Sequence, residues 1–316
     1  MDFQHKPVLV AEVLEMLDPA RRSTIVDCTL GGAGHSREIL NLLPADSWLV
    51  GIDQDDDALE AAGKILAGHE NVILLKGNFG QLKALLGDWK RPIDGFLFDL
   101  GVSSWQLDNP ERGFAFQHDS PLDMRMNQQG LLSAHIIVNS WSAREMTEIF
   151  RAYGEEKWSS RVAAFIVKAR ENKPIDTTGE LVDVIKAAIP AAARREGGHP
   201  GRRVFQALRI AVNSELDNLR LGLEAALDIC APGGVVAAIS YHSLEDRIVK
   251  QLFKDKAVGC ICPPEAPVCQ CKHKPEIRIL TKKPIGPGVA ELENNPRSRS
   301  AKLRAAIKLG SNESER

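Results

Sequence analysis

The residues of this sequence best suited to chemistry form a glycine-rich turn followed, at a defined distance, by an acid. Gly31, Gly32 and Gly34 interrupt one apolar run, and Asp53, 22 residues after Gly31, ends the next. Glycine has no Cβ, so such a turn lets the backbone approach a ligand closely. A carboxylate about 20 residues further on can accept hydrogen bonds from a ribose diol. The pattern predicts a strand–turn–helix–strand unit that binds an adenosine-bearing cofactor.

The spacing of these glycines favours one class of cofactor over another. A dinucleotide-binding turn needs glycine at its first, third and sixth positions, the last allowing close packing of the helix that binds the pyrophosphate. Counted from Gly31 the sixth position is Ser36, and counted from Gly32 it is Arg37. S-adenosylmethionine has no pyrophosphate and suits a looser turn. We therefore predict S-adenosylmethionine rather than NAD, with an ordinary tight turn as the alternative.

Four cysteines in a proline-rich segment suggest a second kind of chemistry. Cys260, Cys262, Cys269 and Cys271 lie within twelve positions, apart from Cys28 and Cys230, which lie in apolar runs. Four thiolates can surround Zn²⁺ tetrahedrally, although C-x-C is tighter than the usual zinc spacing. In a reducing compartment the alternative is a group of free thiols. Any metal here would be structural.

A segment rich in glycine and arginine suggests contacts with a polyanion. We expect phosphate contacts from Arg194, Arg195, Arg202 and Arg203, and stacking on a base from Phe114 or Phe116. The alternatives are a solvated loop and two core aromatic rings. The formal net charge of −2 argues against binding to nucleic acid through bulk electrostatics, but it permits a locally basic face.

Alternating apolar runs and helical patterns provide the framework for these residues. They predict a Rossmann-like α/β sheet whose ligand lies at the carboxyl ends of its parallel strands. No convincing strand occurs between about Trp105 and Ala231, where a continuous apolar stripe from Phe205 to Leu223 predicts one long helix. A sheet domain, 1–105 and 231–316, would thus be interrupted by a helical insertion, 106–230, which we expect to recognise the substrate. The strands expected are Thr24–Thr29, Trp48–Ile52, Val72–Lys76, Ile93–Leu100, Val235–Tyr241, Ile277–Lys282 and Ala301–Leu309.

Composition limits the remaining choices. The chain has 316 residues, 44% of them hydrophobic and 26% charged, which is typical of a globular protein. No apolar run approaches the roughly 20 residues that span a bilayer, and the N-terminus lacks the pattern of a signal peptide. We therefore expect a cytoplasmic protein without a membrane partner.

Longer sequence motifs add a resemblance that covers the chain from His5 to Arg304. The sequence resembles the bacterial 16S ribosomal RNA (cytosine-N4)-methyltransferases, the MraW or RsmH family, and PLDMRM and HSLEDRIVK are the most specific of the matches. The motifs that carry the resemblance are HKPVL, DCTLGGAGHS, GIDQD, FDLGVSSWQLD, ERGFAF, PLDMRM, YGEE, HPGRRVFQALRIAVNSEL, APGG, ISYHSLEDRIVK and NPRSRSAKLR.

The resemblance implies a class I S-adenosylmethionine-dependent methyltransferase fold and an activity. The substrate would be the exocyclic amine of one cytosine in the decoding centre of 16S ribosomal RNA, on the small ribosomal subunit. Two alternatives stay open: methylation of another nucleic-acid or protein amine, and a non-catalytic ribosome-binding factor with the same fold. The cofactor contacts implied by the matching motifs are Ala33, Gly34, His35, Asp53, Phe79, Asp99 and Gln106.

The group that assists the attacking amine is left open by the sequence. The lone pair of a cytosine amine is delocalised into the ring, so attack requires an acceptor that binds an N–H. Many amino-methyltransferases use Asn/Asp-Pro-Pro-aromatic after the fourth strand, whereas this chain has Asp99-Leu100-Gly101-Val102-Ser103-Ser104. The candidates are Asp99, Ser103 and His242. The alternative role for His242 is a cap at the start of a helix, where we expect Ser243 as the N-cap.

Overall fold

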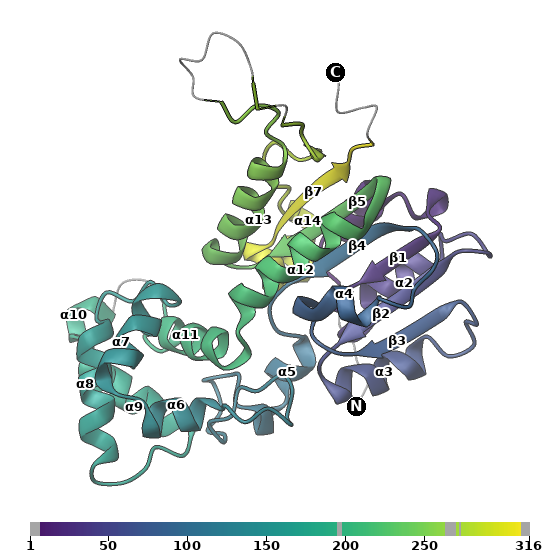
Figure 1. Cartoon of the computed structure of the whole chain (residues 1–316). Helices are drawn as coiled ribbons and strands as arrows, with labels where there is room; N and C mark the ends of the chain where they lie inside the picture. The colour runs from purple at the N-terminus through teal and green to yellow at the C-terminus, as the bar shows by residue number, and fades with distance from the viewer. Residues whose placement is uncertain (1–6, 195–197, 263–269, 272, 311–316) are drawn as a thin grey trace. The chain divides into compact units, whose positions relative to one another are not determined.

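The computed structural model describes residues 7–194, 198–262, 270–271 and 273–310 (Figure 1). It divides into two compact units. The first contains residues 1–101 and 216–316, and the second contains residues 102–215. None of the helices in the described ranges is both long and apolar enough to cross a bilayer.

The first unit is built on a seven-stranded sheet of order β3-β2-β1-β4-β5-β7-β6. Neighbouring strands from β3 to β5 pair in parallel, and β7 is antiparallel to both β5 and β6. This arrangement confirms the predicted α/β sheet of the class I methyltransferase type. The strands are β1 (Thr24–Asp27), β2 (Trp48–Asp53), β3 (Val72–Lys76), β4 (Ile93–Asp99), β5 (Cys230–Ser240), β6 (Ile277–Ile279) and β7 (Lys302–Lys308).

Alternating side chains along these strands create two hydrophobic cores, one on each face of the sheet. Val26 and Phe96 pack with α4, α12 and α13, whereas Ile25 and Leu97 pack on the opposite face with α1, α2 and α3. Burial on both faces explains why the strands are continuously apolar. The helices of this unit are α1 (Val10–Leu17), α2 (Gly34–Leu40), α3 (Asp56–Ile65), α4 (Leu82–Leu85), α12 (Glu215–Ile229), α13 (Ser243–Lys256) and α14 (Val289–Asn294).

The strand order also determines where a ligand can bind. β1 lies between β2 and β4, so the chain leaves the sheet in opposite directions on either side of β1. In an open α/β sheet the crevice at such a switch point, outside the carboxyl ends of the strands, is the usual ligand site. The sequence places the glycine turn, Asp53 and Asp99 at those ends.

The second unit is helical and has its own core, to which Met146, Phe150 and Leu208 contribute. Reciprocal capping boxes start three of its helices: Ser103 with Gln106, Ser142 with Glu145, and Thr177 with Glu180. These contacts satisfy backbone N–H groups that a helix start would leave unpaired. Its helices are α5 (Ser104–Asp108), α6 (Ala134–Ser140), α7 (Ala143–Ala152), α8 (Ser159–Arg170), α9 (Thr178–Ala188), α10 (Ala191–Arg194) and α11 (Arg202–Asn213).

The prediction of one long helix over Phe205–Leu223 is wrong. Ser214 has a φ of 49°, a left-handed conformation that ends α11 and separates it from α12. The apolar stripe therefore serves two cores: Phe205 belongs to the core of the second unit and Leu223 to that of the first. The division into units falls at 215/216, so α12, which the sequence pattern groups with the insertion, belongs almost entirely to the sheet unit.

The predicted fifth strand also begins earlier than its apolar run suggests. Cys230 already pairs with Ile93, and regular pairing resumes at Val235 opposite Gly95. The residues between form an irregular stretch in which Gly233 has a φ of 80°. A β-bulge of this kind accommodates extra residues without ending the strand.

Candidate cofactor and catalytic site

The glycine turn after β1 has left-handed backbone at two positions. Gly31 has a φ of 49° and Ala33, which precedes α2, has a φ of 56°. A left-handed conformation costs a non-glycine residue roughly 1–2 kcal/mol, so Ala33 is held there by its surroundings. Gly34 begins α2, and a Cβ at this position would lie 3.2 Å from the ring of Pro7. The turn is therefore tightly packed against Pro7.

Asp53, at the end of β2, is hydrogen-bonded to that turn. Its Oδ2 accepts the Gly31 N–H at 2.8 Å, and its Oδ1 accepts the Asp55 N–H at 2.9 Å. Burial raises the pKa of Asp53 to about 6, and its backbone hydrogen bonds partly oppose that shift. The acid and the glycine turn thus form one preorganised acceptor surface, and the acid is ionised above about pH 6.

Asp99, at the end of β4, is oriented by two side chains of the same unit. Tyr241 donates its hydroxyl to Oδ1 at 2.8 Å, and His35 Nδ1 lies 3.5 Å from Oδ2. The Asp99 N–H also donates to Thr29 Oγ1 at 2.6 Å. Burial and the neighbouring Asp99 carboxylate raise the pKa of Tyr241 well above its usual value, so its hydroxyl stays a donor at neutral pH.

The partners of His35 determine where its ring carries a proton. Nε2 lies 2.8 Å from the carbonyl oxygen of Val8. Because a carbonyl only accepts, Nε2 must be the protonated nitrogen. His35 thus lies at the second position of α2, buried between Val8 and Asp99, and it is not the helix cap.

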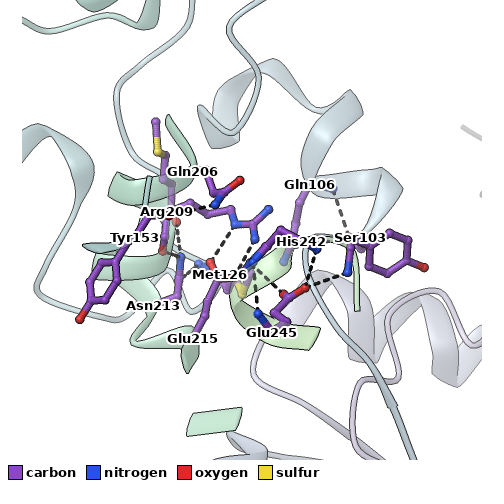
Figure 2. Close-up of polar contacts among 12 residues, drawn as sticks. Ser103, Gln106, Met126, Tyr153, Gln206, Arg209, Asn213, Glu215, His242 and Glu245 are labelled. Atoms are coloured by element: carbon purple, nitrogen blue, oxygen red, sulfur yellow. Dashed lines mark hydrogen bonds and ion pairs between the residues drawn. The ribbon is translucent and has the colours of Figure 1, made fainter. Parts of the chain in front are cut away.

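His242 is the N-cap of α13, so the prediction of Ser243 as the cap is wrong. His242 Nδ1 accepts the Glu245 N–H at 3.4 Å, and the Glu245 carboxylate accepts the N–H groups of Tyr241 and His242 at 2.8 and 3.2 Å (Figure 2). Nε2 lies 3.2 Å from Glu245 Oε1 but has no hydrogen bond among the described residues. This confirms the capping role. A contact with a substrate base stays a prediction.

Phe79 lies just after β3, in the short 3-10 helix Phe79–Gln81. Its ring meets that of Phe98 edge to face, with centroids 5.6 Å apart. A Cβ at Gly222 of α12 would lie 2.8 Å from Phe79 Cδ2, so the absence of a side chain there makes room for the ring. The packing holds Phe79 at the carboxyl end of β3, where an adenine contact is predicted.

Ser103 and Gln106 belong to the second unit and cap α5 reciprocally. Ser103 Oγ accepts the Gln106 N–H at 3.2 Å, and Gln106 Oε1 accepts the Ser103 N–H at 3.0 Å (Figure 2). The Gln106 side chain is buried. Both side chains therefore stabilise the start of α5, and their predicted roles toward cofactor and base stay predictions.

Two of the motifs that carry the resemblance, PLDMRM and HPGRRVFQALRIAVNSEL, contact each other within the second unit. Asn213 Nδ2 donates to the Met124 carbonyl at 2.8 Å, and its Oδ1 accepts the Met126 N–H at 2.8 Å. Arg209 forms a two-pronged ion pair with Glu215, both contacts being 2.8 Å (Figure 2). Met124 has a φ of 63°, and the Asn213 side chain brackets this strained residue. These motif residues hold the architecture of the unit together.

Among the predicted RNA-binding residues, Arg194, Arg202 and Arg203 are exposed, and Arg195 lies outside the described residues. Arg203 donates to the Glu155 carbonyl at 3.2 Å. The two aromatic candidates are mainly structural. Phe114 is buried in the core, and Phe116 stacks on His199 with ring centroids 4.3 Å apart and planes at 9°.

Three of the four predicted metal-binding cysteines gather in one place. Sγ atoms of Cys260, Cys262 and Cys271 all lie within 4.8 Å of one another. Cys269 lies outside the described residues. None of the described cysteines forms a disulfide.

The sequence argument missed two residues of this site. Asp27 ends β1, is buried, and accepts the Ser36 hydroxyl at 2.7 Å; burial raises its pKa. Tyr241, one position before His242, carries the hydroxyl that orients Asp99. The position of Asp27 just before the glycine turn is a signal that could have identified it. No local signal predicts the contact of Tyr241 with Asp99, because the two residues are 142 positions apart.

Comparison with known proteins identifies the family. The model of the MraW methylase family matches residues 2–309. The chain belongs to the MraW methylase family. Relatives in that family cover nearly the whole chain. The chain is 52% identical to the ribosomal RNA small subunit methyltransferase H of Symbiobacterium thermophilum, over 99% of this chain and 99% of that protein.

Two further relatives have the same name. The protein from Heliobacterium modesticaldum is 52% identical over 98% of this chain and 100% of its own length. That from Halothermothrix orenii is 49% identical over 97% of this chain and 99% of its own length. The match to the MraW methylase family, over residues 2–309, thus includes both units.

Proposed function

We propose that this protein transfers the methyl group of S-adenosylmethionine to the N4 amine of a cytosine in 16S ribosomal RNA. The observation that carries the proposal is the hydrogen bond between Asp53 and Gly31, which joins acid and glycine turn at the carboxyl edge of a class I sheet. The names of the MraW-family relatives support ribosomal RNA of the small subunit as substrate. A ribosomal substrate would make the protein cytoplasmic.

The chain offers a donor and acceptor set that fits this cofactor. Ionised Asp53 would accept hydrogen bonds from the two ribose hydroxyls, and the backbone of Ala33, Gly34 and His35 would line the turn beside it. Phe79 would contact the adenine, and the resemblance to the family implies a further contact from Gln106. Bound there, the cofactor supplies an electrophilic methyl group on a sulfonium. No phosphate has to be bound, in agreement with a turn that lacks the third glycine.

Asp99 is the strongest candidate for the group that assists the cytosine amine. It is a carboxylate whose two oxygens are oriented by Tyr241 and His35. By accepting an N–H from the amine, the Asp99 carboxylate would localise the nitrogen lone pair. It would later receive the proton that the methylated nitrogen must lose. Ser103 Oγ already accepts a backbone N–H, and His242 Nδ1 does the same, which makes them weaker candidates.

The remaining contribution of the chain is positioning. An in-line displacement gains most of its rate when the reacting atoms are held in alignment. The target base has to leave its stack to reach the donor, and the exposed arginines Arg194, Arg202 and Arg203, with Arg195, would bind the surrounding phosphates. The helical unit would thus serve as the part that recognises the substrate.

Transfer of labelled methyl groups tests the proposal directly. Full-length protein would be incubated with tritium-labelled cofactor and, separately, assembled small subunits, bare 16S ribosomal RNA, DNA and protein. Label in ribosomal RNA, recovered as N4-methylcytidine by nucleoside mass spectrometry, is the expected result. Label only in protein or DNA, or binding of small subunits without any turnover, would overturn it. The same assay on the Asp53→Ala variant tests the role of the acid, with Glu60→Ala, an exposed change on α3, as its matched control.

A further inference from the structure

The three described cysteines between α13 and β6 form a cluster that the methylation chemistry does not use. Cys271 Sγ lies 3.8 Å from Cys260 Sγ. A disulfide requires about 2.05 Å between sulfurs, so this pair is reduced. In a tetrahedral site with Zn–S bonds of about 2.3 Å, neighbouring sulfurs lie about 3.8 Å apart. We propose that Cys260, Cys262 and Cys271 are ligands of a structural zinc ion.

Backbone groups around the cluster support thiolate ligands. The Ile261 N–H points to Cys271 Sγ at 3.5 Å, and the Gln270 N–H points to Cys262 Sγ at 3.4 Å. Hydrogen bonds from the backbone to sulfur stabilise negative charge on a thiolate. Each of the two chain segments that meet here therefore donates to a sulfur carried by the other. Thiolates select soft or borderline metals such as zinc over magnesium or calcium.

The loop that carries the cluster is closed at its base. The Glu276 N–H donates to the Lys256 carbonyl at 2.8 Å, and Lys256 Nζ pairs with the Glu276 carboxylate at 2.8 Å. A metal at Cys260, Cys262 and Cys271 would add a second closure further along the loop. Metal ligands drawn from both sides of a loop reduce the conformational freedom of its unfolded state.

The position of the cluster separates it from the reaction. The cysteine cluster follows the last residue of α13, whereas Tyr241 and His242 precede the first residue of that helix. A helix of 14 residues rises about 1.5 Å per residue, so its two ends lie about 20 Å apart. The ion would therefore contribute to the stability of the first unit and would not take part in the methyl transfer.

Metal content and thiol reactivity test the proposal on the full-length protein. The expected result is one zinc ion per chain by mass spectrometry, lost in Cys260→Ser and in Cys271→Ser. Cys230→Ala is the matched control and should retain the metal, because Cys230 is buried in β5. Circular dichroism would verify that each variant is folded.

A thiol reagent provides the second measurement. Burial raises the pKa of Cys230 to about 12 and that of Cys28 well above its usual value, so these two thiols stay unreactive in the folded protein. Reactivity should thus rise several-fold after zinc is removed with a chelator, and fall again when zinc is restored. Folded protein that binds no zinc and whose thiols react at the same rate with and without zinc would overturn the proposal. So would unchanged zinc content in both serine variants.

Discussion

The two units of this protein use their polar residues in different ways. In the sheet unit, Asp53 and Asp99 are acids at strand ends, held in place by a turn N–H and by the Tyr241 hydroxyl. In the helical unit, Asn213 and Arg209 bind backbone and a neighbouring carboxylate. The comparison suggests that the sheet unit contains residues preorganised for chemistry, whereas the distinctive motifs of the helical unit maintain its shape.

The largest expected effect is on catalysis, from Asp99→Asn. The amide keeps the shape of the side chain but loses the charge that would bind an amine N–H and take its proton. Loss of one preorganised group of this kind costs about 10²–10³-fold in kcat. Single-turnover methylation of small subunits would measure it.

A smaller fall in kcat, of about tenfold, is expected for Tyr241→Phe, which removes one hydrogen bond to a charged group. Unchanged kcat in both variants would remove Asp99 from the mechanism.

Asp53→Ala should act on cofactor affinity. Two hydrogen bonds to a charged acceptor, each worth about 1.5 kcal/mol or more, correspond to at least about 100-fold in Kd. Calorimetric titration with S-adenosylmethionine and its demethylated product would measure this loss, with Glu60→Ala as the control. Equal affinity in the two variants would separate the acid from the cofactor.

Asn213→Ala should act on stability and leave cofactor affinity unchanged. The change removes hydrogen bonds to the backbone of Met124 and Met126, at a cost of about 2 kcal/mol in the free energy of unfolding. Thermal unfolding of the full chain would report it as a lower midpoint for the helical unit. Asn172→Ala, at an exposed position, is the matched control. If cofactor affinity fell instead, the division of roles between the units would be wrong.

The pKa of Asp53 predicts the pH dependence of cofactor binding. That pKa is raised to about 6 by burial, so the carboxylate is ionised above this pH and protonated below it. A protonated acid loses acceptor capacity, and affinity should therefore fall up to about tenfold per pH unit below 6. Titrations between pH 5 and 7.5 would measure the slope. The Asp53→Ala variant should show a flatter profile, and identical profiles would assign the titration to another group.

Much of this division could be predicted from the sequence, because strands and turns leave strong local signals. Asp53 and Asp99 were identifiable since parallel strands end at one edge of a sheet. Tyr241 was not, because its contact with Asp99 depends on the pairing of β4 with β5 across 142 positions. The apolar spacing of Phe205–Leu223 continues through Ser214, so periodicity alone could not reveal a break caused by one left-handed residue.

The smallest expected effect concerns the arginines of the helical unit. Arg202 is exposed at the start of α11, whereas Arg203 already donates to the Glu155 carbonyl, so Arg202→Ala is the cleaner test. If Arg202 neutralises one phosphate, its loss should raise the KM for RNA a few-fold and reduce the slope of log affinity against log salt by about 0.7–0.9. Arg144→Ala, a change at another exposed arginine on α7, is the control. A slope equal to that of the control would mean that this face of the helical unit does not bind RNA, and that recognition depends on another part of the chain.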